Sequence, residues 1–319
     1  MNEFELIKNY FQNLSKKNLS SLNLNDDVFF DKKKNLVVTI DTYIEGNHFI
    51  NFKQPDLVIK KIIRSSISDL LCKGVKPKYY FISGSGDKKT FFRSNLLKIR
   101  KALNSEQKKY NIYLSGGDTV FSNKLSFTIT SIGFSKDIIY RNQTKANDDI
   151  YVTGNLGDSY FGLLILKKRI KLDKLLNRYF VNKYFLPDLQ IKLSSLLNKF
   201  ATSSIDISDG LLTDLDKLIN KQKLSYKINL MKIPISKNLK KVLKIKKLSK
   251  IDYISNGDDY QILFTAPKKK RGIIKKLSSH YRFKITKIGS IQSFKNKSSI
   301  VDHKNIKIGL KNKGYFHQF

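Results

Sequence analysis

The chain has 319 residues, of which 40% are hydrophobic, and this is enough for a sizeable core in one large or two ordinary domains. Its single cysteine excludes an intrachain disulfide and a zinc site built from several cysteines. Lysine and arginine outnumber aspartate and glutamate by 61 to 26, but the excess is mostly lysine and is scattered along the whole length. Because nucleic-acid-binding proteins usually gather basic residues into one patch, we interpret the net charge of +35 as a compositional bias that also attracts anionic substrates.

Apolar residues at helical spacing predict helices, and short apolar runs predict strands. In the N-terminal half these patterns predict helices over 4–17, 55–72 and 91–109 and strands over 28–30, 36–40, 79–83, 111–114 and 125–134. In the C-terminal half they predict strands over 150–153, 203–207 and 261–265, a strand pair near 285–291, and helices over 161–168 and 211–219. The charged stretch 136–149 separates the halves, so we expect one domain over 1–137 and a second over 138–319.

The junction at 206–210 is the most informative short segment of the chain. A buried strand runs into a helix there, and the junction carries Asp206, Ser208 and Asp209 followed by Gly210. Carboxylates supply the oxygen ligands that Mg²⁺ prefers, and the free N–H groups at a helix start bind anions. The junction therefore suits a metal ion or a phosphate, although Asp209 could equally be a simple helix cap.

Other short acidic clusters have the same character. They are Asp26 and Asp27 before the first strand, Asp41 with Thr42 after Ile40, Asp69 one helical turn from Ser65, Gly116 to Thr119, and Asn256 to Asp259. A solvated position is the alternative for Asp69, and an ordinary turn is the alternative for the Gly-Gly-Asp segment. Carboxylates that converge repel one another unless cations neutralise them, so the hypothesis is a nucleotide site with several Mg²⁺ ions and phosphoryl-transfer chemistry.

Two glycine-containing segments carry less functional weight. Residues 84–90 contain glycines and lysines but lack the GxxxxGK[ST] spacing of a phosphate-binding loop, so we expect an ordinary loop. Residues 154–159 follow a strand and precede a helix, as in a phosphate-binding turn, but a well-capped helix explains them equally. A lone histidine such as His48 is more often a structural hydrogen-bonding residue than a ligand.

Eight segments in this order resemble one family across nearly the whole chain: NDDVFF, VVTIDTYIEGNHF, ISDLLCKGVKP, LSGGDT, DIYVTGNLGDS, SSIDISDGLLTDL, NGDDYQILFTAP and KGYFH. They resemble the thiamine-monophosphate kinases, which belong with the aminoimidazole-ribonucleotide synthetase-like ATP-binding proteins. The resemblance implies an α+β fold, with an N-terminal α+β domain whose sheet pairs across a homodimer and a C-terminal α/β domain that closes over the site. It also implies Mg²⁺- and ATP-dependent phosphorylation of thiamine monophosphate to thiamine diphosphate by direct in-line transfer.

The same resemblance assigns roles to individual residues. Its implied Mg²⁺ ligands are Asp27, Thr39, Asp41, Asp69, Asp118, Asp206 and Asp209. Its implied ATP contacts are Gly117, Asp118, Arg141 and Ser208, and its implied thiamine monophosphate contacts are His48, Asp258 and Tyr315. Asp209, Asp118 and Arg141 would be the catalytic residues. Because the nucleophile would be an oxygen of the substrate's own phosphate, no protein base is required.

The chain departs from the family pattern at four places. Asn25 stands where the family usually has glycine, Ile40 where it usually has a hydroxyl residue, and Asp258 where it usually has the longer glutamate. Residues 145–148 lack the usual Pro-Gly turn. These changes affect expected affinity and metal stoichiometry more than the type of reaction.

Two rival functions compete with the kinase. A sister activity on the same fold, such as aminoimidazole-ribonucleotide or selenophosphate synthesis, is disfavoured by the Asn-His-Phe and Lys-Gly-Tyr segments, and selenophosphate synthesis also by the lack of an N-terminal cysteine. A basic nucleic-acid-binding protein without catalysis would bind in a salt-sensitive way, but it leaves the placement of the acids unexplained. The first residues lack the apolar core of a signal peptide, so we expect a cytoplasmic protein without a membrane partner.

Overall fold

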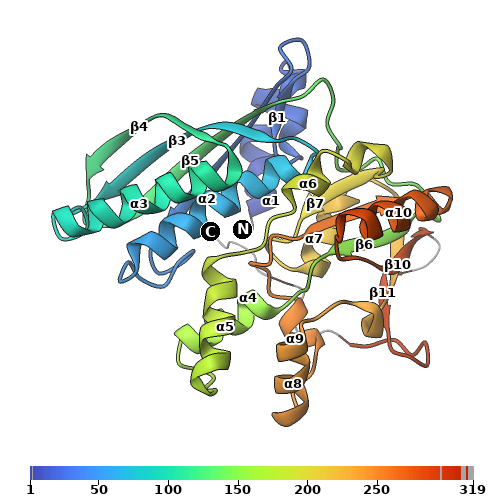
Figure 1. The fold of residues 1–319 in the computed structure, drawn as a ribbon. Helices are drawn as coiled ribbons and strands as arrows, with labels where there is room; N and C mark the ends of the chain where they lie inside the picture. Colours follow the sequence, from blue (N-terminus) through green and yellow to red (C-terminus); the bar gives the residue numbers. More distant parts are fainter. Residues whose placement is uncertain (2, 295–296, 310–313, 315–319) are drawn as a thin grey trace.

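The computed structural model describes residues 1, 3–294, 297–309 and 314, which form two β-sheets with helices packed around them (Figure 1). The N-terminal half contributes the strands β1 (Phe29–Asp31), β2 (Leu36–Ile44), β3 (Pro77–Gly86), β4 (Tyr113–Phe121) and β5 (Ser126–Phe134). Its helices are α1 (Glu3–Leu6), α2 (Pro55–Cys72) and α3 (Arg93–Tyr110), and the short helical turns η1 (Ile7–Phe11), η2 (Gln12–Ser15) and η3 (Leu19–Leu24) follow α1.

The C-terminal half contributes the second sheet and most of the helices. Its strands are β6 (Asp149–Thr153), β7 (Ser203–Asp206), β8 (Leu224–Asn229), β9 (Ile262–Ala266), β10 (Ile285–Ser293) and β11 (Ser299–Val301). Its helices are α4 (Asp158–Leu166), α5 (Lys174–Phe185), α6 (Ile191–Ser194), α7 (Leu211–Leu218), α8 (Lys237–Ile245), α9 (Ile251–Ile254) and α10 (Arg271–Tyr281). Among the described residues, no helix has both the length and the apolar character that crossing a membrane requires.

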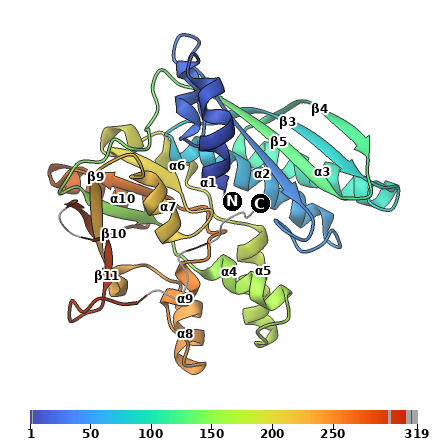
Figure 2. The same ribbon diagram turned by 180° about the vertical axis from the view of Figure 1, so that it is seen from behind.

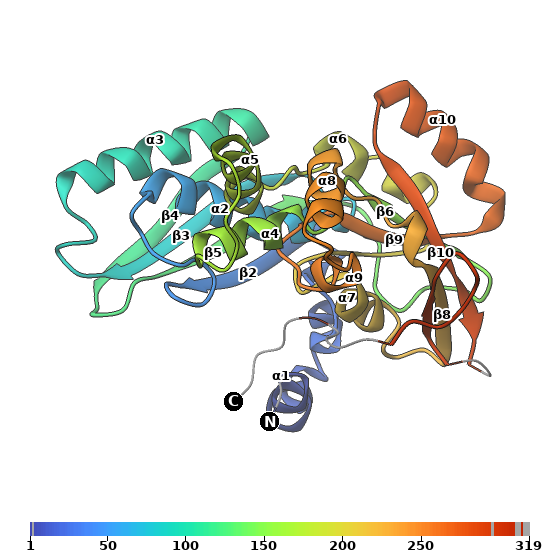
Figure 3. The ribbon, with the colours of Figure 1, turned by 90° about the horizontal axis from the view of Figure 1, so that it is seen from below.

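The first sheet has the order β1-β2-β5-β3-β4 and is covered by helices on one face (Figure 3). Helices α2 and α3 lie on that face, where Tyr80 and Ile129 are buried in the core with them and Val37 packs in a smaller cluster with Leu70 of α2. The opposite face carries large apolar side chains that remain exposed, including Ile40 and Phe134. Helices therefore cover one face of this sheet, and its other face is exposed.

Helix α2 joins the two halves of the molecule. Ile59, Ile62, Ile63 and Ile67 on this helix are fully buried, as the apolar spacing predicts. Beyond the apolar stripe, Ser66 and Ser131 of β5 share a hydrogen bond of 3.0 Å, while Ser68 bonds Asp206 of β7. A helix with partners on both sides fixes how the two sheets face each other.

The second sheet has the order β11-β8-β10-β6-β9-β7, and among its described strand pairs only β8 and β11 are parallel. The predicted alternation of strands and helices in this half thus does not build a parallel α/β sheet, because alternation alone does not set strand direction. Strand β7 lies at the edge nearest α2, and helix α7 follows it directly. Leu211, Leu212 and Leu215 of α7 are fully buried in the core beneath this sheet.

Several element boundaries differ from those that the sequence predicts. Strand β2 continues through Asp41, strand β3 runs on to Gly86, and strand β4 includes the whole Gly-Gly-Asp-Thr segment that we expected to follow a strand. The amphipathic segment 4–17 forms α1 and irregular turns instead of one regular helix, and residues 285–291 lie in one strand instead of a pair. In the first sheet, pairing with a neighbouring strand overrides the local turn signal that glycine and aspartate give.

A buried ion pair between α2 and α3 provides a test of this packing. The Nε and Nη2 atoms of Arg64 donate to the carboxylate of Glu106 at 2.8 and 3.0 Å, and both side chains are almost fully buried. We expect Glu106→Gln to reduce the free energy of unfolding by about 3 kcal/mol, because it leaves a buried guanidinium without a counter-charge. Urea denaturation measures this loss. The exposed Lys108→Gln on the same helix is the control, and an equal effect from both variants would contradict the account.

Candidate functional site

A cleft of about 690 Å³ lies between the two halves of the chain. Strand β2, helix α2, the β7–α7 junction and the segment before β9 all contribute to its lining. Most of the residues that the sequence singled out meet here: Asp27, Thr39, Asp41, His48, Asp69, Arg141, Asp206, Ser208, Asp209 and Asp258. These residues are far apart in the chain, so the fold itself assembles the site.

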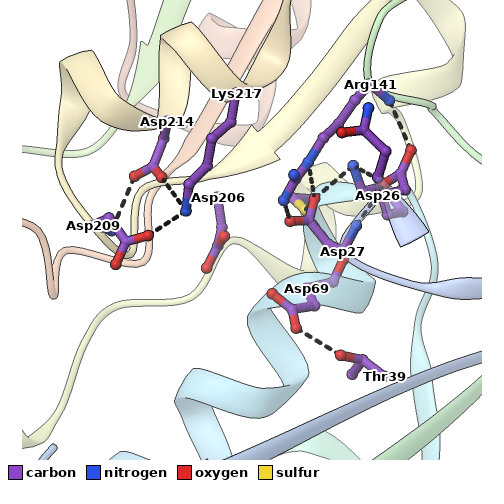
Figure 4. Close-up of polar contacts among 12 residues, drawn as sticks. Asp26, Asp27, Thr39, Asp69, Arg141, Asp206, Asp209, Asp214 and Lys217 are labelled. Carbon is purple, nitrogen blue, oxygen red and sulfur yellow. Dashed lines mark hydrogen bonds and ion pairs between the residues drawn. The ribbon is translucent and has the colours of Figure 1, made fainter. Parts of the chain in front are cut away.

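Three carboxylates form the centre of the cleft (Figure 4). Asp27 precedes β1, Asp69 lies on α2 and Asp206 ends β7, and one oxygen from each lies within 4.8 Å of the others. The Thr39 hydroxyl donates to Asp69 at 2.7 Å, and the Ser68 hydroxyl donates to Asp206. Oxygen ligands at this spacing suit a hard divalent cation such as Mg²⁺.

Two cationic side chains offset part of this negative charge. The fully buried ammonium of Lys73 lies 2.6 Å from both Asp26 and Asp27 and donates to the Ser204 carbonyl at 2.8 Å. The Arg141 guanidinium pairs with Asp27, and its backbone N–H donates to Asp26 at 2.9 Å. Both cations bind on the Asp26–Asp27 side of the cluster, which leaves Asp69 and Asp206 facing the cavity.

Three acids of this cleft, Asp41, Asp69 and Asp206, are poorly suited to stay ionised by themselves. Burial raises the pKa of Asp206 to about 6 and the pKa of Asp69 well above its usual value, and for Asp69 the neighbouring Asp41 and Asp206 raise it further. Burial also raises the pKa of Asp41 to about 6, and its Oδ2 atom has no hydrogen-bond partner among the described residues. A bound divalent cation would remove both the repulsion and the missing contact, so these residues fit a metal site.

The β7–α7 junction directs Asp209 toward the cleft. Asp214 accepts hydrogen bonds of 3.0 Å from the backbone N–H groups of Asp209 and Gly210, and Lys217 pairs with the Asp209 carboxylate. Helix α7 has Gly210 at its N-cap, so Asp209 does not cap the helix, and the simple-cap alternative is wrong. Gly210 has φ +125°, and a Cβ there would lie 2.2 Å from the Ser255 carbonyl oxygen, which explains the glycine.

A second polar group in the same cleft surrounds Asp258. Asp258 accepts from the ammonium of Lys61 at 2.7 Å and from the Tyr260 hydroxyl at 3.0 Å, and the ammonium also lies 4.0 Å from the ring centre of Tyr184. The Ile44 N–H donates to Nδ1 of His48 at 3.0 Å. His48 therefore makes the structural hydrogen bond expected of a lone histidine while it also lines the cleft.

Two of the proposed site residues lie elsewhere. Gly117 and Asp118 are on β4, the exposed edge strand, and are absent from the cleft lining. In the first sheet, Asp118 pairs with Ser83, Ser83 with Thr128 and Thr128 with Thr42, so three strand spacings, roughly 14 Å, separate Asp118 from β2. Asp118 is therefore not brought to the other acids within one chain. Tyr315 lies outside the described residues.

Strand pairing already explains why residue 117 is a glycine. A Cβ at Gly117 would lie 1.8 Å from the Ile82 carbonyl oxygen on β3. Any larger residue would push β4 away from β3. A glycine here thus needs no nucleotide contact to account for it.

The glycine turn at 154–159 is also accounted for without phosphate. Its Gly157 N–H donates to both carboxylate oxygens of buried Asp259, at 2.9 and 3.0 Å. An internal carboxylate thus occupies the start of α4, where a phosphate would otherwise bind. The capped-helix alternative is the one that the geometry supports.

Sequence reasoning missed the lysines that hold the acids in place. Lys61, Lys73 and Lys217 each pair with a cleft carboxylate, but nothing separates them by residue type from the many other lysines of the chain. One signal was available for Lys73, which lies between the apolar residues Leu71 and Val75 at the end of a core helix. Asp214 was missed because it falls within the amphipathic pattern of α7.

Comparison with known proteins gives consistent matches. Residues 25–135 match the model of the AIR synthase related protein, N-terminal domain. The chain is 34% identical over 99% of its length to the thiamine-monophosphate kinase of Buchnera aphidicola subsp. Acyrthosiphon pisum (strain APS), covering 98% of that protein. It is 30% identical over 91% of its length to the enzyme of the same name from Escherichia coli (strain K12), covering 90% of that protein.

A solved structure matches the fold over nearly the whole chain. The structure described as AaThiL complexed with AMPPCP and TMP superposes with a TM-score of 0.84 at 26% identity, covering 99% of this chain and 97% of that one. The arrangement of both sheets is thus shared with that protein. The expected α+β fold with two sheets is confirmed.

The raised pKa of Asp41 predicts a specific pH dependence of stability. The pKa of Asp41 is about 6 in the folded state and roughly 3.9 when unfolded, so the folded state binds the proton more tightly. The free energy of unfolding of the metal-free protein should therefore fall as the pH rises between these two values. Asp41→Asn should remove this contribution. The thermal midpoint of the variant should therefore rise relative to that of the wild type as the pH increases from 5 to 7.

The exposed Asp137→Asn is the control for this measurement and should follow the wild type at every pH. Adding Mg²⁺ at pH 7.5 should raise the midpoint of the wild type more than that of Asp41→Asn, because ion binding stabilises the folded state. The same pH profile in the wild type and Asp41→Asn would show that burial does not raise the pKa of this carboxyl group.

Proposed function

The chain belongs to the thiamine-monophosphate kinase family, and we propose that it performs the family's reaction in the cleft between its two sheets. It is a thiamine-phosphate kinase that converts thiamine monophosphate to thiamine diphosphate with ATP as co-substrate. The observation that carries the assignment to this cleft is the convergence of Asp27, Asp69 and Asp206 from three distant segments. Their spacing, together with the raised pKa values of Asp69 and Asp206, fits a site for metal-bound phosphates.

The metal site is the first part of the proposal. Asp27, Asp69 and Asp206 would hold Mg²⁺ together with Asp41, Thr39 and Asp209, and the ions would supply positive charge that offsets the triphosphate and orients it. Ile40 stands beside Asp41 where the family usually has a hydroxyl residue, so the number of ion contacts is expected to be smaller here. Thr39 donates to Asp69 and fixes the direction of that carboxylate.

Cationic side chains would complete the phosphate site. Arg141 and Lys217 pair with Asp27 and Asp209, which are proposed metal ligands, so each cation lies beside the position of the phosphates. Ser208 adds a hydroxyl at the same junction. We propose that these groups hold the γ-phosphoryl group in line with an oxygen of the thiamine phosphate. That oxygen is already anionic at neutral pH, so no general base is needed.

Another part of the cleft lining would bind the thiamine part of the substrate. Asp258 and His48 line it, and Lys61 holds the Asp258 carboxylate in place from within the core. Asp258 is shorter than the family's usual glutamate by one methylene, so a looser contact is expected. Tyr315, which would stack on a thiamine ring, is part of the proposal on the strength of the sequence resemblance alone.

A second copy of the chain would complete the site. The open face of the first sheet exposes Ile40 at 66%, Phe134 at 51% and Phe81 at 37% of their surface, and β4 is an exposed edge that also bears Phe121 at 74%. Apolar area of this kind favours a protein interface. We propose that the sheets of two copies pair, and that Asp118 and Gly117 of each copy act at the cleft of the other.

The remaining expectations follow from the same proposal. Residues 1–137 and 138–319 would be separate domains, with the second closing over the cleft, and this is supported by the fact that each described sheet draws its strands from one side of that boundary. The cytoplasmic location stays a prediction from the sequence.

Substitution of the metal ligands tests the proposal directly. Asp209→Asn and Asp118→Asn should each lower kcat by about 100-fold or more, because each removes a charge that neutralises the metal-bound phosphates, and both variants should keep the fold. The measurement is formation of thiamine diphosphate from thiamine monophosphate with ATP and Mg²⁺, with circular dichroism as the check on folding. The exposed Asp252→Asn is the control. Wild-type turnover in either variant would remove that residue from the mechanism.

Mixing the two inactive variants tests the dimer. If Asp118 acts on the partner's cleft, a mixed dimer of Asp118→Asn and Asp209→Asn chains contains one intact site, so free exchange should restore about a quarter of wild-type activity. Activity that stays at the level of the separate variants after exchange, verified by differently tagged chains, would show that both residues serve the same chain's site.

A further inference from the structure

Lys73 is a fully buried cation with three oxygen partners. It directly follows the last residue of α2, and none of its surface is exposed. Its ammonium lies 2.6 Å from Oδ1 of Asp26, 2.6 Å from Oδ2 of Asp27 and 2.8 Å from the Ser204 carbonyl oxygen. An ammonium has three N–H donors and no acceptor, so these three oxygens satisfy it completely.

The three oxygens come from separate parts of the chain. Asp26 and Asp27 follow the N-terminal helical segment, which lies between the two halves of the molecule in Figure 2, and Ser204 is on β7. Carboxylate and backbone carbonyl oxygens are also the ligands that hard divalent cations take in proteins. The Lys73 ammonium thus occupies an oxygen set of the kind that would otherwise suit a metal ion.

The charges on this side of the cleft already balance. Besides pairing with Lys73, the Asp26 carboxylate accepts from the backbone N–H groups of Asp27 and Arg141, at 2.8 and 2.9 Å. Asp27 pairs with both Lys73 and the Arg141 guanidinium. Two carboxylates therefore face two cations, and Asp26 needs no further counter-charge.

The other buried acids of the cleft differ in this respect. Among the described residues, Asp41, Asp69 and Asp206 form no ion pair. Neighbouring carboxylates without a counter-charge repel one another when they ionise. These are therefore the acids that require cations from solution.

The two cations of the balanced side differ in access to the cleft. The Arg141 side chain is 11% exposed and lines the cleft, whereas Lys73 has no exposed surface and is absent from the lining. Bound phosphates can therefore draw Arg141 away from Asp27 and free one oxygen of that carboxylate for a metal ion. Lys73 is out of their reach and stays with its three oxygens.

We propose that the Lys73 ammonium is a permanent cation that takes the place of a divalent ion between Asp26 and Asp27. The cleft then holds its divalent ions on the side of Asp69 and Asp206, and it binds one ion fewer than its acids would otherwise hold. This inference rests on the proposed function, because it sets the number of metal ions at the same site. Lys73 is thus a positioning residue, which holds Asp27 by one oxygen and touches no substrate.

Counting bound Mn²⁺ ions tests this inference. Lys73→Ala should bind about one Mn²⁺ ion more per chain than the wild type, because it leaves two carboxylates without a counter-charge and makes room for a hydrated ion. Electron paramagnetic resonance of the free Mn²⁺ gives the number bound. Lys61→Ala is the matched control, because Lys61 is a buried lysine of the same helix that pairs with the single carboxylate of Asp258, and it should leave the number unchanged.

Two further variants test the carboxylate side of the pair. Asp26→Asn should bind as many Mn²⁺ ions as the wild type, because Lys73 and not a metal ion occupies that carboxylate. Adding Asp26→Asn to Lys73→Ala should return the number of ions to that of the wild type, because the second acid needed to bridge an ion is gone.

Thermal unfolding separates this role from simple packing. The midpoint of metal-free Lys73→Ala should fall by about 10 °C, because a buried pair of acids loses its counter-charge. Mn²⁺ should restore most of this loss, whereas the loss of packing alone would not respond to a metal ion.

The outcomes separate this inference from the proposed function. An unchanged number of ions in folded Lys73→Ala, or the loss of an ion in Asp26→Asn, would overturn the role of Lys73 and leave the kinase assignment intact. If Lys73→Ala does not fold, Asp26→Asn decides alone. Absence of Mn²⁺ binding by the wild type with AMPPCP present would overturn the proposed function, whereas the role of Lys73 is decided by the difference in ion number between each variant and the wild type.

Discussion

Repulsion among buried carboxylates is the constraint on which the site depends. Asp27, Asp69 and Asp206 are held within contact distance of a common point, and Asp41 lies beside them with one oxygen lacking a hydrogen bond among the described residues. Burial raises the pKa values of Asp41, Asp69 and Asp206 and so opposes the ionisation of these three carboxyl groups. Placing these carboxylates together lowers the stability of the fold, and a bound divalent cation with its phosphates would offset that cost.

The position of helix α2 brings the carboxylate cluster together. Helix α2 is packed between the two sheets and carries Ser68 and Asp69, and Lys73 directly follows its last residue. The position of this helix therefore fixes the Asp69 carboxylate, the hydroxyl that donates to Asp206 and the buried ammonium that pairs with Asp27. Rigid elements on both sides hold these groups, and no loop has to close to form the carboxylate cluster. The cationic groups are placed on the Asp26–Asp27 and Asp209 sides, which leaves the centre of the cleft negative.

Local patterns in the sequence predicted much of the fold. Apolar spacing located α2 with its bounds, and acidic residues next to apolar runs identified nearly every carboxylate of the cleft. Boundaries near Asp41 and Asp118 were misplaced because pairing across a sheet extends strands through residues that favour turns when considered alone. Long-range pairing of this kind is not encoded in any short window.

The supporting cations could not be predicted for a different reason. Their roles depend on burial, and Lys73 or Lys217 differs from a surface lysine only in what the fold places around it. The role of Asp214 likewise depends on the fold, because its carboxylate accepts hydrogen bonds from the backbone N–H groups of Asp209 and Gly210. Sequence motifs therefore located the charged groups that line the cleft, and the structure was needed to find the groups that hold them in place.

Crystals grown with Mn²⁺ and AMPPCP offer the most direct measurement of the central claim, because anomalous scattering locates the metal without assumptions about the protein. The account predicts anomalous peaks that share oxygen ligands from Asp27, Asp69 and Asp206, with the phosphates on their open side. Peaks located elsewhere, with these three carboxylates bound only by lysine and arginine, would contradict it.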